Sequence, residues 1–166
     1  IPLPGFYRRT KNWDIVVTYK GVLVAAIECK SQVGSFGNNF NNRTEEAIGN
    51  AVDIWRGYEA GLLGNIRPWL GFVFVMEYAP KSITPIKDRG EPLYRADPVF
   101  DNTSYMDRYE ILFQRLVRER LYDAACLIPT ERGAGIHHEP LTEVSPRNLT
   151  AAIAGRVAYV ANLDGH

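Results

Sequence analysis

Three polar side chains lie at the ends of two apolar segments of the sequence. Asp14 lies at the start of segment 13–19, and Glu28 and Lys30 end segment 22–30. Glu28 and Lys30 are two residues apart, so in a strand they project from the same face. A pair of carboxylates can hold a divalent cation such as Mg²⁺, and a neighbouring lysine can orient water or offset charge on a phosphate. These residue types together favour phosphodiester hydrolysis, although Glu-x-Lys alone is common at solvated strand ends.

The two apolar segments are expected to form a β-hairpin, because Lys20-Gly21 separates two β-branched runs. Their nearly continuous apolar character predicts that the hairpin lies centrally in a sheet covered on both faces. A regular two-residue turn would pair Asp14 with Ile27 and place it on the opposite face from Glu28. A bulge or a three-residue loop shifts the register by one and sets Asp14 opposite Glu28. We expect the shifted register.

The rest of the chain predicts an α/β (α+β) fold, a mixed β-sheet flanked by helices in one domain over residues 1–166. Segment 34–43 is rich in Gly and Asn and is expected to be a loop, after which Thr44 caps a helix that ends near Gly61. The other expected elements are a strand at 69–78, a Pro-rich connection at 80–98, a helix at 105–122, a strand at 124–128, a long loop at 129–147 and a helix at 149–161.

Composition fits one globular domain and gives no global signal for a partner. Of 166 residues, 46% are hydrophobic, and 19 Lys+Arg balance 19 Asp+Glu, which excludes a disordered chain and any strongly basic or acidic surface overall. Cys29 and Cys126 lie in separate apolar runs and are expected to be reduced core thiols, which favours a cytoplasmic location. The sequence shows no leader and no apolar run long enough for a bilayer, so we expect a soluble protein without a membrane partner.

Around Asp14, Glu28 and Lys30 the sequence resembles the PD-(D/E)XK nucleases, and more closely the XhoI family of type II restriction endonucleases. The similarity covers residues 4–14, 25–47 and 108–125, and the Asn-rich stretch is its most specific part. The resemblance implies a restriction-endonuclease-like fold and Mg²⁺-dependent cleavage of double-stranded DNA at a palindromic hexanucleotide, CTCGAG, leaving 5′-phosphate and 3′-hydroxyl ends. It also implies a homodimer, since two-fold symmetry matches a palindrome, and a methyltransferase in the same cell.

The resemblance also assigns roles to residues of this chain. Asp14 and Glu28 are the implied metal ligands, with the carbonyl of Cys29 beside them, and Lys30 is the implied catalytic lysine. Trp13 stands where the family name has Pro, which leaves the carboxylate unchanged. Family members carry a further N-terminal region, so we expect a segment before Ile1 to be missing from this domain.

Residues that read DNA are expected near the catalytic end of the hairpin. Asn pairs with adenine and Arg with guanine, whereas the alternative for an Asn/Gly run is a series of positive-φ turns. The adjacent residues His137 and His138 lack the spacing of zinc ligands, so we expect them to contact bases or phosphates, or to lie in a solvated loop. The residues expected to contact phosphate are Arg8, Arg9 and Lys11. The candidate DNA-binding residues are Gln32, Asn38, Asn39, Asn41, Asn42, Arg43, Arg132, His137 and His138.

Two other functions fit the same residues. One is a structure-selective or repair nuclease of this fold, which would follow DNA shape rather than sequence. The other is a DNA-binding module that has lost turnover, although Asp14, Glu28 and Lys30 are all present. Discrete fragments would indicate the restriction enzyme, preference for branched DNA the repair enzyme, and binding without nicking the module.

Overall fold

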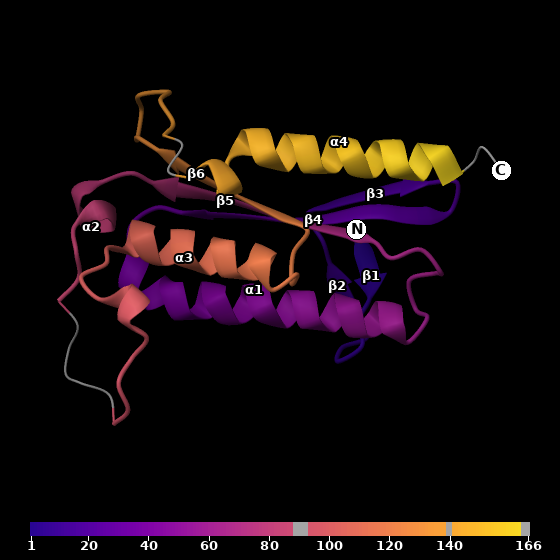
Figure 1. The fold of residues 1–166 in the computed structure, drawn as a ribbon, viewed down its shortest axis with the longest axis horizontal. Helices are drawn as coiled ribbons and strands as arrows, with labels where there is room; N and C mark the ends of the chain where they lie inside the picture. The colour runs from indigo at the N-terminus through magenta and orange to yellow at the C-terminus, as the bar shows by residue number, and fades with distance from the viewer. Residues whose placement is uncertain (88–92, 139–140, 164–166) are drawn as a thin grey trace.

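The computed structural model describes residues 1–87, 93–138 and 141–163 (Figure 1). Its strands are β1 (Pro2–Pro4), β2 (Thr10–Asn12), β3 (Ile15–Tyr19), β4 (Val22–Gln32), β5 (Trp69–Glu77) and β6 (Ala124–Thr130). Its helices are α1 (Phe36–Glu59), α2 (Pro80–Ile83), α3 (Tyr105–Arg118) and α4 (Pro146–Asn162), and short 3₁₀ turns lie at Pro98–Phe100 and Thr142–Val144. None of the described helices has the length and apolar character needed to cross a membrane.

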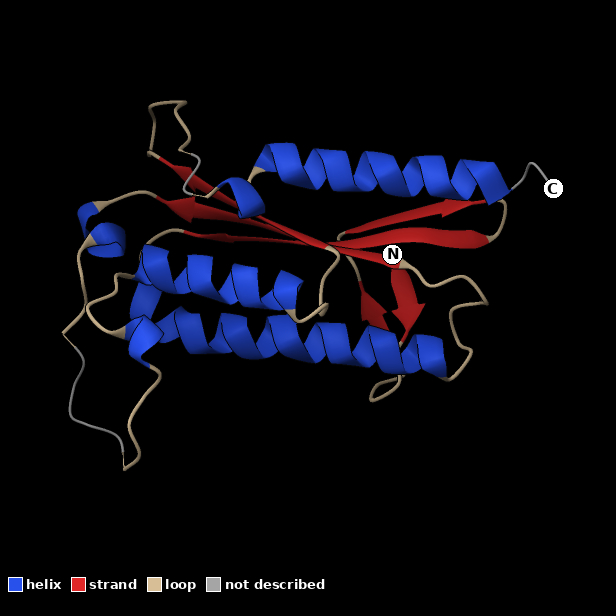
Figure 2. Ribbon diagram, viewed as in Figure 1, coloured by secondary structure: helices blue, strands red, loops and turns tan. Residues whose placement is uncertain are grey.

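A mixed four-stranded sheet forms the centre of the fold, in the order β3-β4-β5-β6. β3 is antiparallel to β4, whereas β4, β5 and β6 run parallel. Helices α1 and α3 cover one face of this sheet and α4 lies along the other (Figure 2). β1 and β2 form a separate antiparallel pair on the α1 side. The expected architecture, a mixed sheet flanked by helices, is confirmed.

Aromatic side chains fill the larger core, between the sheet and helices α1 and α3. Phe74 stacks on Tyr109 with ring centroids 4.6 Å apart, and Phe72 packs on Phe113 at 5.4 Å. Ala26 of β4 faces the same core, whereas its neighbours in sequence face the smaller cluster under α4. Because side chains alternate along a strand, Glu28 and Lys30 share the α1/α3 face with Ala26.

The register of the β3–β4 hairpin confirms the predicted shift. Lys20 and Gly21 form a two-residue turn with φ values of 48° and 80°, the positive values that a tight hairpin turn needs. Tyr19 pairs with Val22, but the pairing slips by one residue between Thr18 and Val17, so that Ile15 lies opposite Ile27. The shift therefore comes from a β-bulge rather than from a longer loop. Asp14, one residue before Ile15, comes level with Glu28.

The predicted central position of the hairpin is wrong for its first arm. β3 is an edge strand of the sheet, and Ile15 and Tyr19 are each more than two-fifths exposed. Of the two arms of the hairpin, β4 alone pairs on both sides and is covered on both faces. An apolar run of five residues does not by itself distinguish an edge strand from a central one, because both occur next to a hydrophobic core.

The predicted loop over residues 34–43 is also wrong, because α1 begins at Phe36. Phe36 and Phe40 are spaced by four residues and pack on Tyr105 and Tyr109 of α3, with ring centroids 6.2 and 5.0 Å apart. Thr44 does not cap the helix; its hydroxyl donates to the carbonyl of Phe40 within it, at 2.9 Å. Packing of an aromatic stripe thus outweighs the weak helix propensity of the asparagines.

Most other expected elements form within a few residues of their predicted bounds. α3 starts at Tyr105 as predicted, capped by Ser104, but ends at Arg118 because Arg120 adopts φ 59°. α4 starts three residues earlier than predicted, after Ser145, whose hydroxyl accepts from the amide of Asn148 at 3.2 Å. The pair β1–β2 and the single turn α2 were not predicted. Residues 88–92 of the expected connection and residues 139–140 of the expected loop lie outside the described residues.

Candidate active site

The open end of the β3–β4 hairpin brings Asp14, Glu28 and Lys30 together, as the sequence predicts. Asp14 accepts the backbone N–H of Cys29 on its Oδ2 atom at 2.7 Å, which ties the start of β3 to β4. The Nζ atom of Lys30 pairs with Oε1 of Glu28 and lies 3.9 Å from Oδ2 of Asp14. The two carboxylates therefore converge on a single ammonium group.

The three side chains differ in their contact with solvent. The Glu28 side chain is only 2% exposed, although it carries a charge, whereas that of Asp14 is 45% exposed. A carboxylate loses most of its hydration when it is buried, so it stays charged only where cations or hydrogen-bond donors replace the water. Glu28 is thus held by neighbouring cations in the interior, and Asp14 forms the outer, solvent-facing side of the site.

A second lysine, Lys11, contacts the buried carboxylate. Its Nζ atom lies 2.8 Å from Oε2 of Glu28, and it also lies 4.6 Å from the centre of the Trp13 ring. Lys11 belongs to β2, in the small sheet beside α1 (Figure 1). The sequence placed Lys11 near the site as a phosphate contact but did not predict this ion pair. The sequence feature that could have indicated this contact is the positive charge of Lys11, three residues before Asp14.

The donor atoms of the site fit a hard divalent cation. Among the described residues no cluster of three or more His, Cys, Asp and Glu side chains gathers, so a metal here would rely on two carboxylates. Asp14 and Glu28 approach one cation already, the Lys30 ammonium, and the Cys29 carbonyl belongs to the adjoining backbone. An all-oxygen set of this kind with room for water suits Mg²⁺ better than softer metals.

The thiol of Cys29 lies on the opposite face of β4 from Glu28 and Lys30, packed against the cluster under α4. Burial raises the pKa of the Cys29 thiol, and the negative charges of Asp14 and Glu28 raise it further. From that face, a contact from Cys29 to a metal held by Glu28 would come from its backbone carbonyl.

Comparison with known proteins identifies the family. Residues 1–139 match the family described as "Restriction endonuclease XhoI". The chain belongs to this family. It is 41% identical to the type II restriction enzyme BstVI of Geobacillus stearothermophilus over 97% of this chain and 76% of that protein.

Two further relatives are also named as type II restriction enzymes. The type II restriction enzyme XhoI of Xanthomonas vasicola is 45% identical over 70% of this chain, and AbrI of Azospirillum brasilense is 56% identical over 49%. These two matches cover 48% and 38% of the relatives, less than half of their length. No solved structure matches the chain significantly.

In this member of the XhoI family, Gln32 lies next to the site but points inward. Its side chain is buried, and its Oε1 accepts from the hydroxyl of Tyr109 at 2.6 Å while its Nε2 donates to the carbonyl of Gly34 at 3.2 Å. Both polar atoms of the amide are therefore used inside the protein. These contacts fix the end of β4 against α3, and the predicted role of Gln32 in contacting DNA stays a prediction.

The Asn-rich residues lie on the first turns of α1 and divide into two sets. Asn38, Asn41 and Asn42 are exposed and share one helix face, because they are three and four residues apart. Asn39 and Arg43 are half-buried: the Asn39 amide donates to the Ser35 carbonyl at 3.2 Å, and Arg43 pairs with Glu46 at 2.6 Å. The first set is free to reach a ligand without breaking a described contact.

The loop after β6 carries the remaining candidates. Arg132 and His137 are exposed, and Arg132 lies 3.4 Å from Glu77 at the end of β5. His138 is held in place, because its ring stacks on Tyr78 at 4.2 Å and its Nε2 lies 2.9 Å from Glu131. This loop and the start of α1 lie at the same end of the sheet, where β4, β5 and β6 finish (Figure 1).

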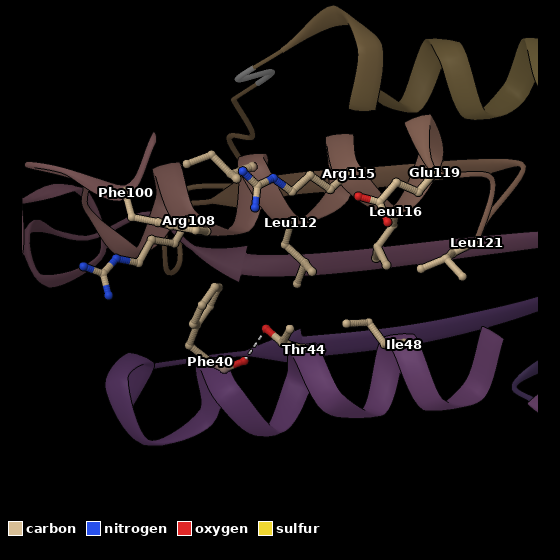
Figure 3. A pocket seen from close by; sticks show the side chains of 11 residues that line it. Phe40, Thr44, Ile48, Phe100, Arg108, Leu112, Arg115, Leu116, Glu119 and Leu121 are labelled. Atoms are coloured by element: carbon tan, nitrogen blue, oxygen red, sulfur yellow. Dashed lines mark hydrogen bonds between the residues drawn. The ribbon is translucent and has the colours of Figure 1, made fainter. Parts of the chain in front are cut away.

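An apolar pocket of about 260 Å³ lies between α1 and α3 (Figure 3). Its lining includes Phe40, Ile48, Leu112 and Leu116, with Arg108 and Arg115 at its margin. None of Asp14, Glu28 or Lys30 lines it. The pocket is therefore separate from the convergence of carboxylates that defines the candidate active site.

Proposed function

We propose that the protein is a type II restriction endonuclease that uses Mg²⁺ to hydrolyse double-stranded DNA at the palindrome CTCGAG. The observation that carries the proposal is the convergence of Asp14 and Glu28 on the ammonium of Lys30, in a chain of the XhoI family. The names of the relatives support site-specific cleavage of DNA. The particular site and the metal follow from the family resemblance and from the oxygen donors.

Asp14 and Glu28, with the Cys29 carbonyl, would hold the metal. Bound Mg²⁺ supplies polarisation of the phosphodiester and a lower pKa for its bound water. Lys30 is placed to orient a water molecule or to offset charge on the phosphate, because its ammonium already lies between the carboxylates. In the reaction a water oxygen bonds to phosphorus, the bond from phosphorus to the 3′ oxygen breaks, and a proton from water ends on that oxygen.

We assign DNA contacts to the end of the sheet where α1 begins and β6 finishes. Asn38, Asn41 and Asn42 present amides that can read adenine, and Arg132 and His137 are exposed on the loop after β6, at the same end of the sheet. Asn39, Arg43 and His138 already hold neighbouring groups, so we assign them to shaping these two surfaces or to phosphate contacts. A palindromic target implies a homodimer with matching two-fold symmetry.

The cellular setting follows from the same proposal. A restriction enzyme cuts unmodified DNA in the cytoplasm, so the host needs a methyltransferase that protects the same sequence. We propose that this methyltransferase acts on DNA independently and forms no stable complex with the endonuclease.

A plasmid digest tests the function directly. The protein is incubated with a sequenced plasmid in Mg²⁺ and in EDTA, and the ends are mapped. Discrete Mg²⁺-dependent ends at CTCGAG are expected, whereas cutting elsewhere would reject the assigned target. Preference for branched DNA would indicate a structure-selective nuclease.

A variant of the central lysine tests the assigned site. Lys30→Ala should slow cleavage by at least about a hundredfold and spare DNA binding, because the lysine acts on the reacting phosphate. Arg56→Ala, at an exposed position near the end of α1 away from the proposed DNA contacts, also removes one positive charge and serves as the control. Normal cutting by Lys30→Ala would show that the site is misplaced, and binding without cutting by the parent protein would indicate a non-catalytic module.

A further inference from the structure

The buried carboxylate of Glu28 is shared between two lysines from different parts of the fold. Oε1 pairs with Lys30, two residues along the same strand, and Oε2 pairs with Lys11 of β2 at 2.8 Å. Each oxygen therefore has its own ammonium partner. Lys30 is the lysine that the nuclease motif supplies, whereas nothing in that motif calls for Lys11.

Lys11 is held in position by its surroundings. Its side chain is 12% exposed, its Nζ donates to the carbonyl of Asn12 at 3.2 Å, and the Trp13 ring lies beneath it. The hairpin that carries Lys11 is tied to α1 by Asp53. The contact between Lys11 and Glu28 is therefore fixed by the fold and differs from the mobile ion pairs of surface lysines.

Asp53 makes that connection with both of its carboxylate oxygens. Oδ1 accepts the backbone N–H groups of Phe6 and Tyr7 at 2.9 and 2.8 Å, and Oδ2 accepts from Nε of Arg8 at 2.8 Å. The side chain is almost fully buried. The turn between β1 and β2 is thus fixed to α1, and β2 is fixed in turn beside the site.

The charges of the site balance without a metal. Asp14 and Glu28 contribute two negative charges, and Lys11 and Lys30 contribute two positive ones. A divalent cation between the two carboxylates would lie on the Oε1 side of Glu28, where Lys30 now lies between Asp14 and Glu28. The Lys11 ammonium on Oε2 of the same carboxylate would repel that cation, because like charges at this range repel. Lys30 also faces Asp14 at the solvent side, so Lys11 is the cation that occupies the inner oxygen of Glu28.

We propose that Lys11 is the resident counter-cation of Glu28, which holds this carboxylate in place in the metal-free protein and competes with a divalent metal for the negative charge of that carboxylate. Lys11 is thus a positioning residue that acts through Glu28. By this competition it sets the metal concentration at which the site fills. The inference rests on the proposed function, in which Asp14 and Glu28 hold Mg²⁺.

Metal binding without DNA tests the competition. The full chain is titrated with Mg²⁺ and with Ca²⁺ in a calorimeter, as wild type, Lys11→Met, Lys11→Gln and the control Lys81→Met, at an exposed position of α2. Both Lys11 variants should bind each ion about tenfold more tightly, the scale on which neighbours of metal ligands act, and Lys81→Met should match wild type. Lys11→Gln keeps a hydrogen-bond donor for Glu28 without the charge, so it separates charge from packing if Lys11→Met fails to fold.

Thermal unfolding gives a second readout. Metal-free Lys11→Met should have a lower Tm than wild type, because Glu28 loses a partner. Saturating Mg²⁺ should raise the Tm of Lys11→Met by more than it raises the Tm of wild type. A purely structural lysine would lower the Tm and leave metal affinity equal or weaker. That result in both Lys11 variants would overturn the inference.

Asp14→Asn distinguishes failure of this inference from failure of the proposed function. Suppose that wild type binds metal, that Asp14→Asn does not, and that the Lys11 variants bind metal with unchanged affinity. This combination would reject the competition by Lys11 and leave the metal site standing. Absence of metal binding by wild type, or equal binding by Asp14→Asn, would reject the metal site and with it the role given to Lys11.

Discussion

Replacing Asp53 by Ala should destabilise the protein strongly, although Asp53 lies outside the candidate active site. The buried carboxylate accepts three hydrogen bonds, from the backbone of Phe6 and Tyr7 and from Arg8. Each is worth about 1 kcal/mol net, and the bond from Arg8 counts least because that side chain is partly exposed. We therefore expect Asp53→Ala to lower the free energy of unfolding by about 3 kcal/mol, measured by urea denaturation.

Glu59→Ala on the same helix is the matched control. Glu59 forms only an exposed pair with Arg56, so its loss should change stability by less than about 0.5 kcal/mol. Hydrogen exchange at the amides of Phe6 and Tyr7 should quicken in Asp53→Ala alone. If Asp53→Ala loses no more stability than Glu59→Ala, Asp53 does not anchor the β1–β2 hairpin, and the fixed position of Lys11 needs another cause.

Three further changes test the core and the burial of single polar groups. Gly71→Ala should cost about 2 kcal/mol in urea denaturation, because a Cβ there would lie 2.5 Å from a carbon of the Trp69 ring. Tyr109→Phe should cost about 1 to 2 kcal/mol by the same assay, since Oε1 of buried Gln32 would lose its donor. Burial raises the pKa of Glu110 to about 7, above its unfolded value, so the folded state loses stability as pH rises from about 4.5 to 7. Glu110→Gln should therefore be more stable than wild type by about 1 kcal/mol at pH 8 and equal to it at pH 4, in denaturation curves at both pH values.

The placement of Asp14 beside Glu28 could be predicted because a side chain in a strand projects from one of only two faces. Side chains alternate between two faces, so a single shift of register decides whether Asp14 joins Glu28 and Lys30 or lies across the sheet. The sequence left open whether a bulge or a longer loop made the shift. The structure shows a bulge between Val17 and Thr18, beside a tight two-residue turn at Lys20 and Gly21, so the turn residues alone do not reveal the shift.

The start of α1 could not be predicted from local preference. Asparagine and glycine favour turns, and nothing nearby in sequence shows that Phe36 and Phe40 meet Tyr105 and Tyr109 of a helix some seventy residues later. That contact changes the meaning of the Asn-rich stretch. Asn38, Asn41 and Asn42 form a row on one helix face instead of part of a loop, so the proposed function gives them a defined orientation before DNA binds.

The contact of Lys11 with Glu28 could not be predicted from the sequence, for a similar reason. β1 and β2 are three residues each and contain two prolines, so no pattern of alternation marks them as strands. Their position depends on Asp53, over forty residues away, whose carboxylate receives the turn between them. A lysine that sequence alone assigns to phosphate is thereby carried to the inner oxygen of Glu28. The electrostatics of the metal-free site thus depend on a hairpin that lies outside the catalytic motif, which is why the Asp53 and Lys11 variants test one connected arrangement.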